Sequence, residues 1–567
     1  MKTAHSPSAD RAVELRPASV VMRLARMGSF HQSRLSFMRI LLRRLADEGW
    51  RIEQRMFEID KSAVGRAVYA AHGPDRSYSL VAFAHDLPPE KRSDRVIAEA
   101  WDATFTLFDG IPTEDDLARL AQNVPLQEAG RISRKELSLS RANRSVRLFE
   151  HVVERLSKGQ QPDAELVASV GYLMRTTAVY GSGKFGAADR AVIAGRPEAA
   201  APFQIEMLSV YLTRCFVLDL VEHLARMRAP DTAVVIEPGL RRQFGIGNST
   251  GLGMAPFLIN HPMLLNNWIA ARETALARVR SVVRATPDEI ATFRDRLQRA
   301  IWNAALWRSD HPLQIAKLAA LRGDLSKLQD RAAATDLAAE NAWNALYEWS
   351  ETALSPEGQE QLVSLLLEPY GDLVDGLSDC LSADESQGAR IDGAMTLGAL
   401  RDLLAKVYDW ALDIDWTDRS AQARAWYVSA EKLEPRLGER FDEPIAEYEQ
   451  PLAPGRDAAA LASDLQDESP LTRVAAFLLD HPQHRHTVRR LQLLDRCPYG
   501  EIRDNTISAS LLPIDMLRCK LSFFGAGHFD PRSDRWVRIN MFRGAPFPGD
   551  LNADTADDWG YPRAAPP

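Results

Sequence analysis

A single hydrophobic core does not enclose a chain of 567 residues, because cores stop growing at roughly 250–300 residues and longer chains divide into domains. We therefore expect roughly two to four domains. Shifts in hydrophobic pattern and composition suggest an α+β domain over 1–150, a helical domain over 151–380, a helical extension over 381–450, a linker over 451–470 and a C-terminal α+β segment over 471–567.

Charge and cysteine content narrow the class of protein. A formal net charge of −8 does not indicate the basic surface that nucleic-acid-binding proteins carry, so we expect no nucleic-acid partner. The four cysteines lie far apart and form no C-x-x-C pair, which favours a reducing, cytoplasmic location. The most apolar stretch, 203–224, is interrupted by charged residues, so we expect a buried helix and no membrane span.

Helical periodicity dominates the chain, and β signals gather near its two ends. Segments 66–71 and 78–84 are alternating apolar runs joined by a Gly-Pro-Asp-Arg connection, which is typical of a hairpin, and 51–59 suggests a third strand. Segments 517–524 and 535–542 suggest a second antiparallel pair, and 232–236 an isolated strand. The predicted fold is α+β and predominantly α-helical, with a helical central body and small antiparallel β segments near the N- and C-termini.

Two amphipathic features have a functional and a structural interpretation. Residues 18–50 show a helical pattern whose polar face is rich in arginine. Such a face can lie on an anionic membrane, but a solvated helix face is the commoner arrangement. Trp302 with Trp307, and Trp343 with Trp349, recur at helical spacing, which is typical of core packing or of an interaction surface.

The first of two glycine-rich segments is YGSGKFG at 180–186, which satisfies G-x-G-x-x-G and carries a lysine able to neutralise a phosphate. As a Walker A loop it fails, because Phe185 stands where Ser or Thr would bind magnesium. As a dinucleotide motif it lacks context, because 164–174 before it reads as helix. A generic anion-binding loop and a plain interhelical turn remain the alternatives.

The second segment, 244–256, sets four glycines among Asn, Ser and Thr. A loop that offers backbone N–H groups to a ligand uses such residues, and the helical pattern that follows favours an anion at the helix start. The alternative is a structural turn before a proline-kinked helix. The predicted substrate-binding residues are Arg175, Lys184, Gly247, Asn248, Ser249, Thr250 and Gly251.

The helix expected at 203–228 carries polar residues on an apolar element. Asp219 and His223 are four residues apart and share a face, and burial with a nearby imidazole suits a carboxyl group to general acid/base work. Satisfied buried polar groups are the commoner explanation of such a pattern. The predicted catalytic residues are His261, Asp219 and His223.

Residues 481–486 hold three histidines, and imidazole suits zinc, copper and iron. Neighbouring Arg485, Arg489 and Arg490 oppose a cation, which favours a surface helix end or an anion-contacting patch. Cys497 or Cys519 with His528 is a weaker candidate for a nucleophile and its base. The sequence assigns no metal, cofactor or oligomeric state.

Taken together, these residues favour a cytoplasmic enzyme that binds a small anionic molecule, a carboxylate or a phosphate. Its pocket is expected where the glycine-rich segments meet the helix at 203–228, and the reaction class stays open. A non-catalytic helical scaffold or partner-binding protein is the alternative. A nucleotide-binding regulatory module is a weaker one.

Overall fold

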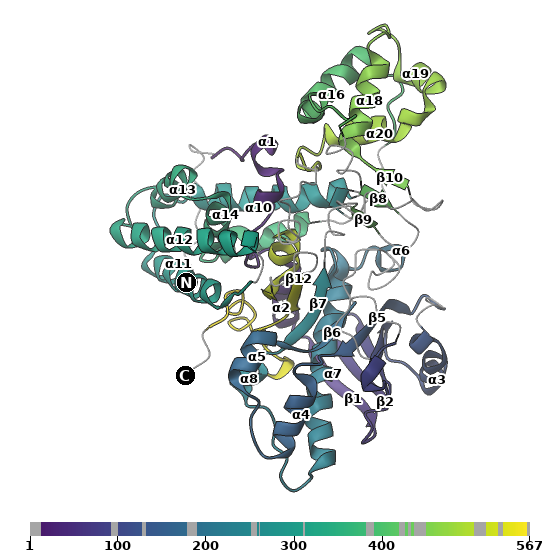
Figure 1. The fold of residues 1–567 in the computed structure, drawn as a ribbon, viewed down its shortest axis with the longest axis vertical. Coiled ribbons are helices and arrows are strands. Elements are labelled where there is room, and N and C mark those ends of the chain that lie inside the picture. Colours follow the sequence, from purple (N-terminus) through teal and green to yellow (C-terminus); the bar gives the residue numbers. More distant parts are fainter. Residues whose placement is uncertain are drawn as a thin grey trace.

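The computed structural model describes residues 13–91, 100–126, 132–177, 190–250, 258–259, 261–309, 312–381, 390–418, 426–428, 433–435, 450–503, 518–530 and 537–563. Their main β element is a nine-stranded sheet with the strand order β1-β2-β3-β4-β5-β6-β7-β12-β11 (Figure 1). The strands are β1 (Arg51–Ile59), β2 (Gly65–His72), β3 (Ser77–Ala84), β4 (Ala103–Asp109), β5 (Glu136–Arg144), β6 (Tyr172–Thr176), β7 (Gly245–Thr250), β11 (Ala526–Asp530) and β12 (Val537–Met541).

One pair of neighbouring strands in the sheet is parallel, and the other pairs are antiparallel. Strands β1 to β6 pair antiparallel in chain order, whereas β7 lies parallel to β6. The hairpin of β11 and β12 then adds antiparallel to β7. Parallel neighbours need a long crossover connection, and helix α7 (Gln204–Arg228) lies in the one between β6 and β7.

Helix α7 is buried along most of its 25 residues, because it packs across one face of the sheet. The Phe216 ring meets the rings of Tyr69 and Phe105 at centroid distances of 6.4 and 5.5 Å. On the other face, α3 (Glu114–Asn123) buries Leu117 and Leu120 against β2 to β5. Both faces of the middle strands are therefore covered.

The predicted fold class is wrong about the β structure, because the sheet is large, mixed and drawn from the whole chain. The hairpin of β2 and β3 and the added strand β1 are confirmed. Strands β3 and β4 are buried on both faces and lose the alternation of a half-exposed strand. Residues 232–236 form no strand, and 517–524 include the π-helical turn η8 (Lys520–Phe524) in place of one.

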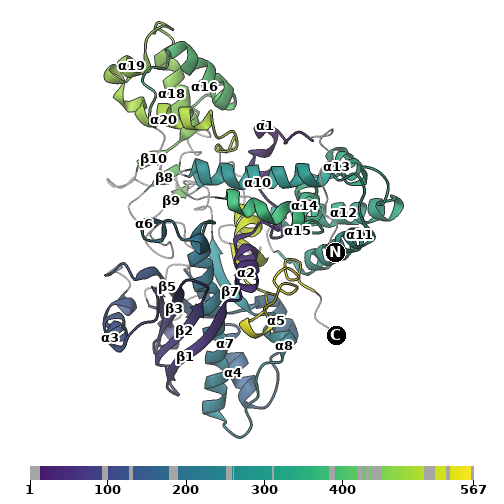
Figure 2. The same ribbon diagram turned by 180° about the vertical axis from the view of Figure 1, so that it is seen from behind.

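The longer helices outside the sheet form two groups, which Figures 1 and 2 show from opposite sides. A helical layer contains α10 (Pro262–Arg280), α11 (Pro287–Leu306), α12 (Pro312–Ala334), α13 (Ala342–Ala353), α14 (Pro356–Leu367) and α15 (Gly371–Val374). A separate helical unit with its own apolar core contains α16 (Leu397–Leu412), α18 (Pro454–Leu465), α19 (Val474–Asp480) and α20 (Arg485–Leu494). Helix α18 lies within the segment expected to be a linker.

Shorter elements complete the described chain. The remaining helices and turns are α1 (Ala18–Val21), η1 (Leu24–Arg26), α2 (Phe37–Asp47), η2 (Pro89–Lys91), η3 (Val124–Leu126), α4 (Phe149–Ser157), α5 (Ala164–Val170), α6 (Arg190–Ile193), η4 (Pro197–Ala199), α8 (Pro238–Arg241), η5 (Asp375–Cys380), η7 (Pro482–His484) and η9 (Pro548–Asp550). A small sheet contains β8 (Trp426–Val428), β9 (Leu433–Pro435) and β10 (Gln450–Leu452).

Three of the arginines of 18–50 form buried or half-buried ion pairs and not a membrane-binding or solvated face. Arg39 is fully buried and donates to Glu368 at 2.7 Å, while Arg34 and Arg43 donate to Asp557 at 2.8 and 2.9 Å. These ion pairs join α2 and the segment before it to the helical layer and to the C-terminal segment.

A second buried ion cluster holds the start of the described chain against the helical layer. Arg16 donates to Glu273 of α10 at 2.7 Å and to Glu360 of α14 at 2.8 Å. Burial alone would raise the pKa of Glu273, but the Arg16 guanidinium outweighs it and holds that pKa below its usual range. The Glu273 carboxylate is therefore ionised in the interior.

Replacing Arg16 by Met should lower the free energy of unfolding by about 3 to 5 kcal/mol, because it leaves buried carboxylates short of a partner. Urea unfolding of wild type and variant measures the difference. The matched control is Arg51→Met, since that side chain is 74% exposed and lies 3.9 Å from Glu53. The control should change stability by less than about 0.5 kcal/mol, and an equal loss in both variants would contradict the assignment.

Candidate functional site

The parallel pair β6 and β7 ends at one edge of the sheet, and several described elements meet there. Because the two strands are parallel, Thr176 and Thr250 end them on the same side. Antiparallel pairing of β12 with β7 starts β12 there as well. We call the side of the sheet at which β6 and β7 end the carboxyl edge. Phe203, the N-cap residue of α7, packs on Phe524 of η8 at a ring-centroid distance of 4.6 Å, so the first turn of α7 lies beside η8. Ligands of open α/β sheets bind beyond such an edge.

Three arginines reach this carboxyl edge on one face of the sheet. Arg175 of β6 pairs with Gly247 of β7 and with Asn143 of β5. Side chains alternate along a strand, so Arg141, two residues from Asn143, lies on the same face as Arg175. Arg538 of β12 pairs with the residue two positions after Gly247, which places it on that face too. We call Arg141, Arg175 and Arg538 the arginine row.

The side chains of the arginine row are partly shielded from solvent. Arg175 is only 9% exposed, and Arg141 and Arg538 are half-buried. The Arg141 guanidinium stacks 3.5 Å above the Trp101 ring, a cation–π contact that fixes its plane. Guanidinium groups in such surroundings suit the recognition of carboxylate or phosphate oxygens.

The opposite face of the same edge carries a buried lysine that the sequence analysis did not single out. Lys520, in η8, is 3% exposed and donates from Nζ to Asn248 Oδ1 at 3.1 Å. Asn248 in turn donates from Nδ2 to the carbonyl of Thr176 at 2.9 Å. Burial lowers the pKa of Lys520 to about 7. A lysine inside the apolar run of 517–524 was the one sequence signal for this group.

Gly245 and Gly247, the glycines of the second segment that the structure describes, lie in the sheet. Residues 245–250, expected in a loop, form strand β7, whose backbone pairs with β12 and β6. A Cβ on Gly247 would lie 2.7 Å from the Tyr172 ring, and one on Gly245 would lie 2.5 Å from the carbonyl oxygen of Met541. Gly247 therefore allows ring packing, and its role in ligand binding stays a prediction.

Some predicted binding residues fall where the structure says little. Lys184 and Gly251 lie outside the described residues. Ser249 and Thr250 are placed as strand residues of β7, without a description of their side chains. Their roles in ligand binding stay predictions.

The predicted catalytic pair is not assembled among the described contacts. The Asp219 carboxylate accepts hydrogen bonds from the Tyr69 hydroxyl at 2.6 Å, Gln54 at 3.1 Å and Arg241 at 3.3 Å. His223 bonds through Nε2 to the carbonyl of Ile59 at 2.7 Å instead. Although Asp219 and His223 are four residues apart on one helix, their side chains therefore bond to different partners.

Asp219 lies in a pocket of about 470 Å³ with apolar walls that include Ile52, Val235 and Phe547. Burial raises the pKa of the Asp219 carboxyl, and the hydrogen bond from Tyr69 opposes the rise. Burial also raises the pKa of the Cys215 thiol at this pocket to about 12, which leaves it unreactive. The pocket therefore offers a satisfied carboxyl group and no activated nucleophile.

The other predicted groups are apart from this pocket or inert. His261 caps the start of α10, which packs on α13, α14 and α15 in the helical layer. Burial raises the pKa of the Cys519 thiol to about 12, and the thiol donates to the carbonyl of Met27. Cys519 therefore has the contacts of a structural cysteine.

Comparison with known proteins gave no match to a family model, to a curated protein or to a solved structure. Among the described helices, none is long and apolar enough to cross a membrane.

The packing role of Gly247 predicts that Gly247→Ala lowers the free energy of unfolding by about 1 to 3 kcal/mol through overpacking against Tyr172. Thermal and urea unfolding measure the loss. Gly323, exposed inside α12 with no atom near an added Cβ, is the matched control. Gly323→Ala should stabilise the chain by about 0.5 to 1 kcal/mol. Undiminished stability in Gly247→Ala would refute the packing role.

The lowered pKa of Lys520 predicts a pH-dependent stability. Burial lowers this pKa to about 7 in the folded chain, while an unfolded lysine keeps its proton to about pH 10.4. Between these values the unfolded state binds more protons, so stability rises with pH by up to about 1.4 kcal/mol per unit. Lys520→Met removes this slope, so its advantage over wild type should shrink from about pH 7 to pH 9.5 in urea unfolding. Identical pH profiles would mean that the folded lysine stays charged.

Proposed function

We propose that the chain is an enzyme that binds a small carboxylate- or phosphate-bearing molecule at the carboxyl edge of β6 and β7. The supporting observation is the meeting of the arginine row on one face of this edge with the Lys520–Asn248 pair on the other. Ligand oxygens placed beyond the strand ends are reached by groups from both faces. The first turns of α7 add the positive end of a helix dipole to the same region.

In this proposal Arg175 and Arg538 bind the anionic group, and Arg141 holds its orientation through Trp101. Lys520 transfers a proton, because an amine whose pKa lies near 7 exchanges a proton readily at neutral pH. Asn248 positions the lysine by accepting its N–H and by anchoring itself on Thr176. The reaction class stays open, as does the identity of the substrate.

Two observations weigh against the scaffold alternative. The arginines of α2 are consumed in internal ion pairs with Glu368 and Asp557. Trp307 and Trp343 are buried in the main core. These features therefore offer little surface to a partner protein.

A cytoplasmic location is also part of the proposal, supported by four cysteines that form no disulfide.

A nucleotide phosphate is the second candidate ligand. The sequence pattern predicts a helix before the G-x-G-x-x-G motif. In the structure strand β6 stands there instead and ends at Thr176, four residues before the glycine-rich segment 180–186 begins. Phosphate-binding glycine motifs follow a strand and precede a helix, and a parallel crossover through α7 then leads to β7. The motif itself, 181–186, lies outside the described residues.

Sulfate and acetate are suitable probes, because sulfate does not titrate near neutral pH and each mimics one ligand class. Calorimetric titration at constant ionic strength should give saturable binding of at least one probe. Arg175→Gln and Arg538→Gln should each weaken it roughly 10- to 100-fold, the loss expected for one charge-assisted hydrogen bond. Wild-type affinity should fall from about pH 6 to pH 8.5 as Lys520 loses its proton, and Lys520→Met should abolish that fall.

The matched control is Arg51→Gln on β1, at the far end of the sheet, which should bind the probes as wild type does. Equal weakening in Arg51→Gln, or none in the arginine-row variants, would contradict the proposal. Arg538 is half-buried, so its variant tests the site even if the more buried Arg175 variant is unstable.

A further inference from the structure

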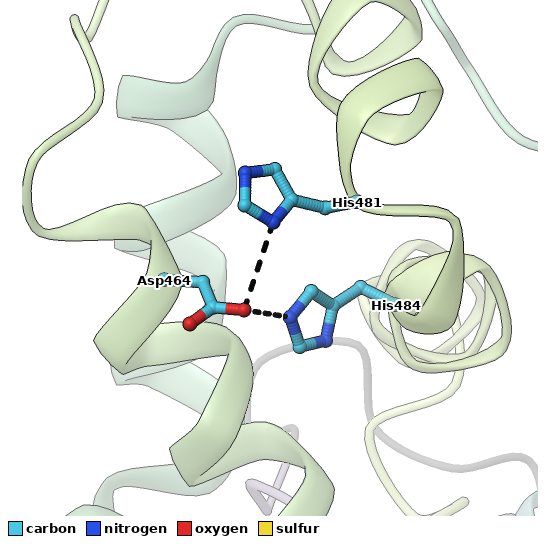
Figure 3. A group of neighbouring side chains, drawn as sticks. All are labelled: Asp464, His481 and His484. Atoms are coloured by element: carbon cyan, nitrogen blue, oxygen red, sulfur yellow. Dashed lines mark hydrogen bonds and ion pairs between the residues drawn. The ribbon is translucent and has the colours of Figure 1, made fainter.

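Asp464, His481 and His484 meet in the helical unit, each from a different element (Figure 3). Asp464 lies near the end of α18, His481 follows α19, and His484 lies in η7. His484 Nε2 is 2.7 Å and His481 Nδ1 is 3.7 Å from the same Asp464 oxygen, Oδ2. Two imidazoles therefore approach the same carboxylate oxygen, whereas a single histidine is enough for an ordinary contact between helices.

The separations suit a transition-metal ion. Zinc binds nitrogen and oxygen ligands at about 2.0–2.2 Å in tetrahedral geometry, which places neighbouring ligand atoms about 3.4 Å apart. The three candidate ligand atoms lie within 4.8 Å of one another. Shifts of well under an ångström between Asp464 and the two imidazoles bring these contacts to that spacing.

The surroundings hold the imidazoles in place. The ring of His481 stacks on Phe477 at a centroid distance of 4.5 Å, and its other nitrogen, Nε2, lies 3.9 Å from Glu468 Oε1. A carboxylate behind a metal-binding imidazole is the usual support of such a ligand. The His484 side chain is only 6% exposed, whereas that of Asp464 is 40% exposed and leaves the cluster open to solvent.

The charge balance differs from the sequence expectation. Neighbouring arginines favoured an anion-contacting patch, but the fold brings Asp464 of α18, and Glu468 just after that helix, against the histidines. The Asp464 carboxylate, 2.7 Å from His484 Nε2, therefore lies where the imidazoles meet.

We propose that Asp464, His481 and His484 bind a divalent transition-metal ion of the zinc class, with Glu468 as the positioning residue behind His481. Two nitrogen ligands and one oxygen ligand suit zinc and its neighbours in the first transition series. Water completes the coordination on the open side. The ion links α18 to the turn after α19, so it stabilises the helical unit, independently of any anion at the carboxyl edge.

The test uses full-length protein stripped with EDTA and titrated with Zn²⁺ by calorimetry and with Co²⁺ by visible absorption. We expect one ion per chain, with a dissociation constant of micromolar or below and a higher unfolding temperature. His481→Gln and His484→Gln should each weaken Zn²⁺ binding more than about 100-fold. Glu468→Gln should weaken it about 10- to 100-fold, as outer-shell changes do.

His486→Gln is the matched control, because His486 is exposed on the next turn and outside the cluster. It should bind Zn²⁺ as wild type does. Failure of the wild type to bind, or equal weakening in His486→Gln, overturns the proposal. Asp464→Asn changes an exposed side chain, so loss of affinity there with an unchanged metal-free unfolding temperature supports the site even if His484→Gln fails to fold.

Discussion

The parallel pairing of β6 with β7 is the constraint on which the rest of the site depends. Without it, the meander of β1 to β6 and the hairpin of β11 and β12 would be two separate sheets, because β7 joins them. The crossover it requires carries α7, whose burial supplies much of the main core. One pairing thus sets the topology, covers a face of the sheet, and brings residues from β5, β6, β12 and η8 to a common edge.

Local signals in the sequence predicted local structure well. The alternating runs at 66–71 and 78–84 form the hairpin of β2 and β3, as predicted. The sequence carries no such signal for pairing between distant segments. Strands β7 and β12 are about 290 residues apart, and the small residues of β7 are of the types typical of a loop. Sequence spacing also does not reveal rotamers, so Asp219 and His223 share a helix face yet bond to different partners.

The candidate site was predictable only in part, for the same reason. Arg175 and Asn248 were singled out by composition near glycines, and the fold does bring their strands together. Lys520 becomes a candidate only in the folded chain, where it is buried beside Asn248, a residue more than 270 positions away in the sequence. The histidines of 481–486 could be noticed in the sequence, but the carboxylate that they meet, Asp464, comes from α18, in a segment whose composition suggests a linker.

Buried cations are neutralised differently in different parts of the molecule. In the helical layer Arg16 and Arg39 bond to carboxylates, so their charges are cancelled. Near β7 and β12, Arg214 and Arg543 donate to backbone carbonyls, and burial lowers the pKa of each to about 10. Carbonyl dipoles satisfy hydrogen bonds but leave the net positive charge in place. Arg214 and Arg543 lie at the amino ends of β6 and β7, and the same desolvation acts at the carboxyl edge, where burial lowers the pKa of Lys520 to about 7.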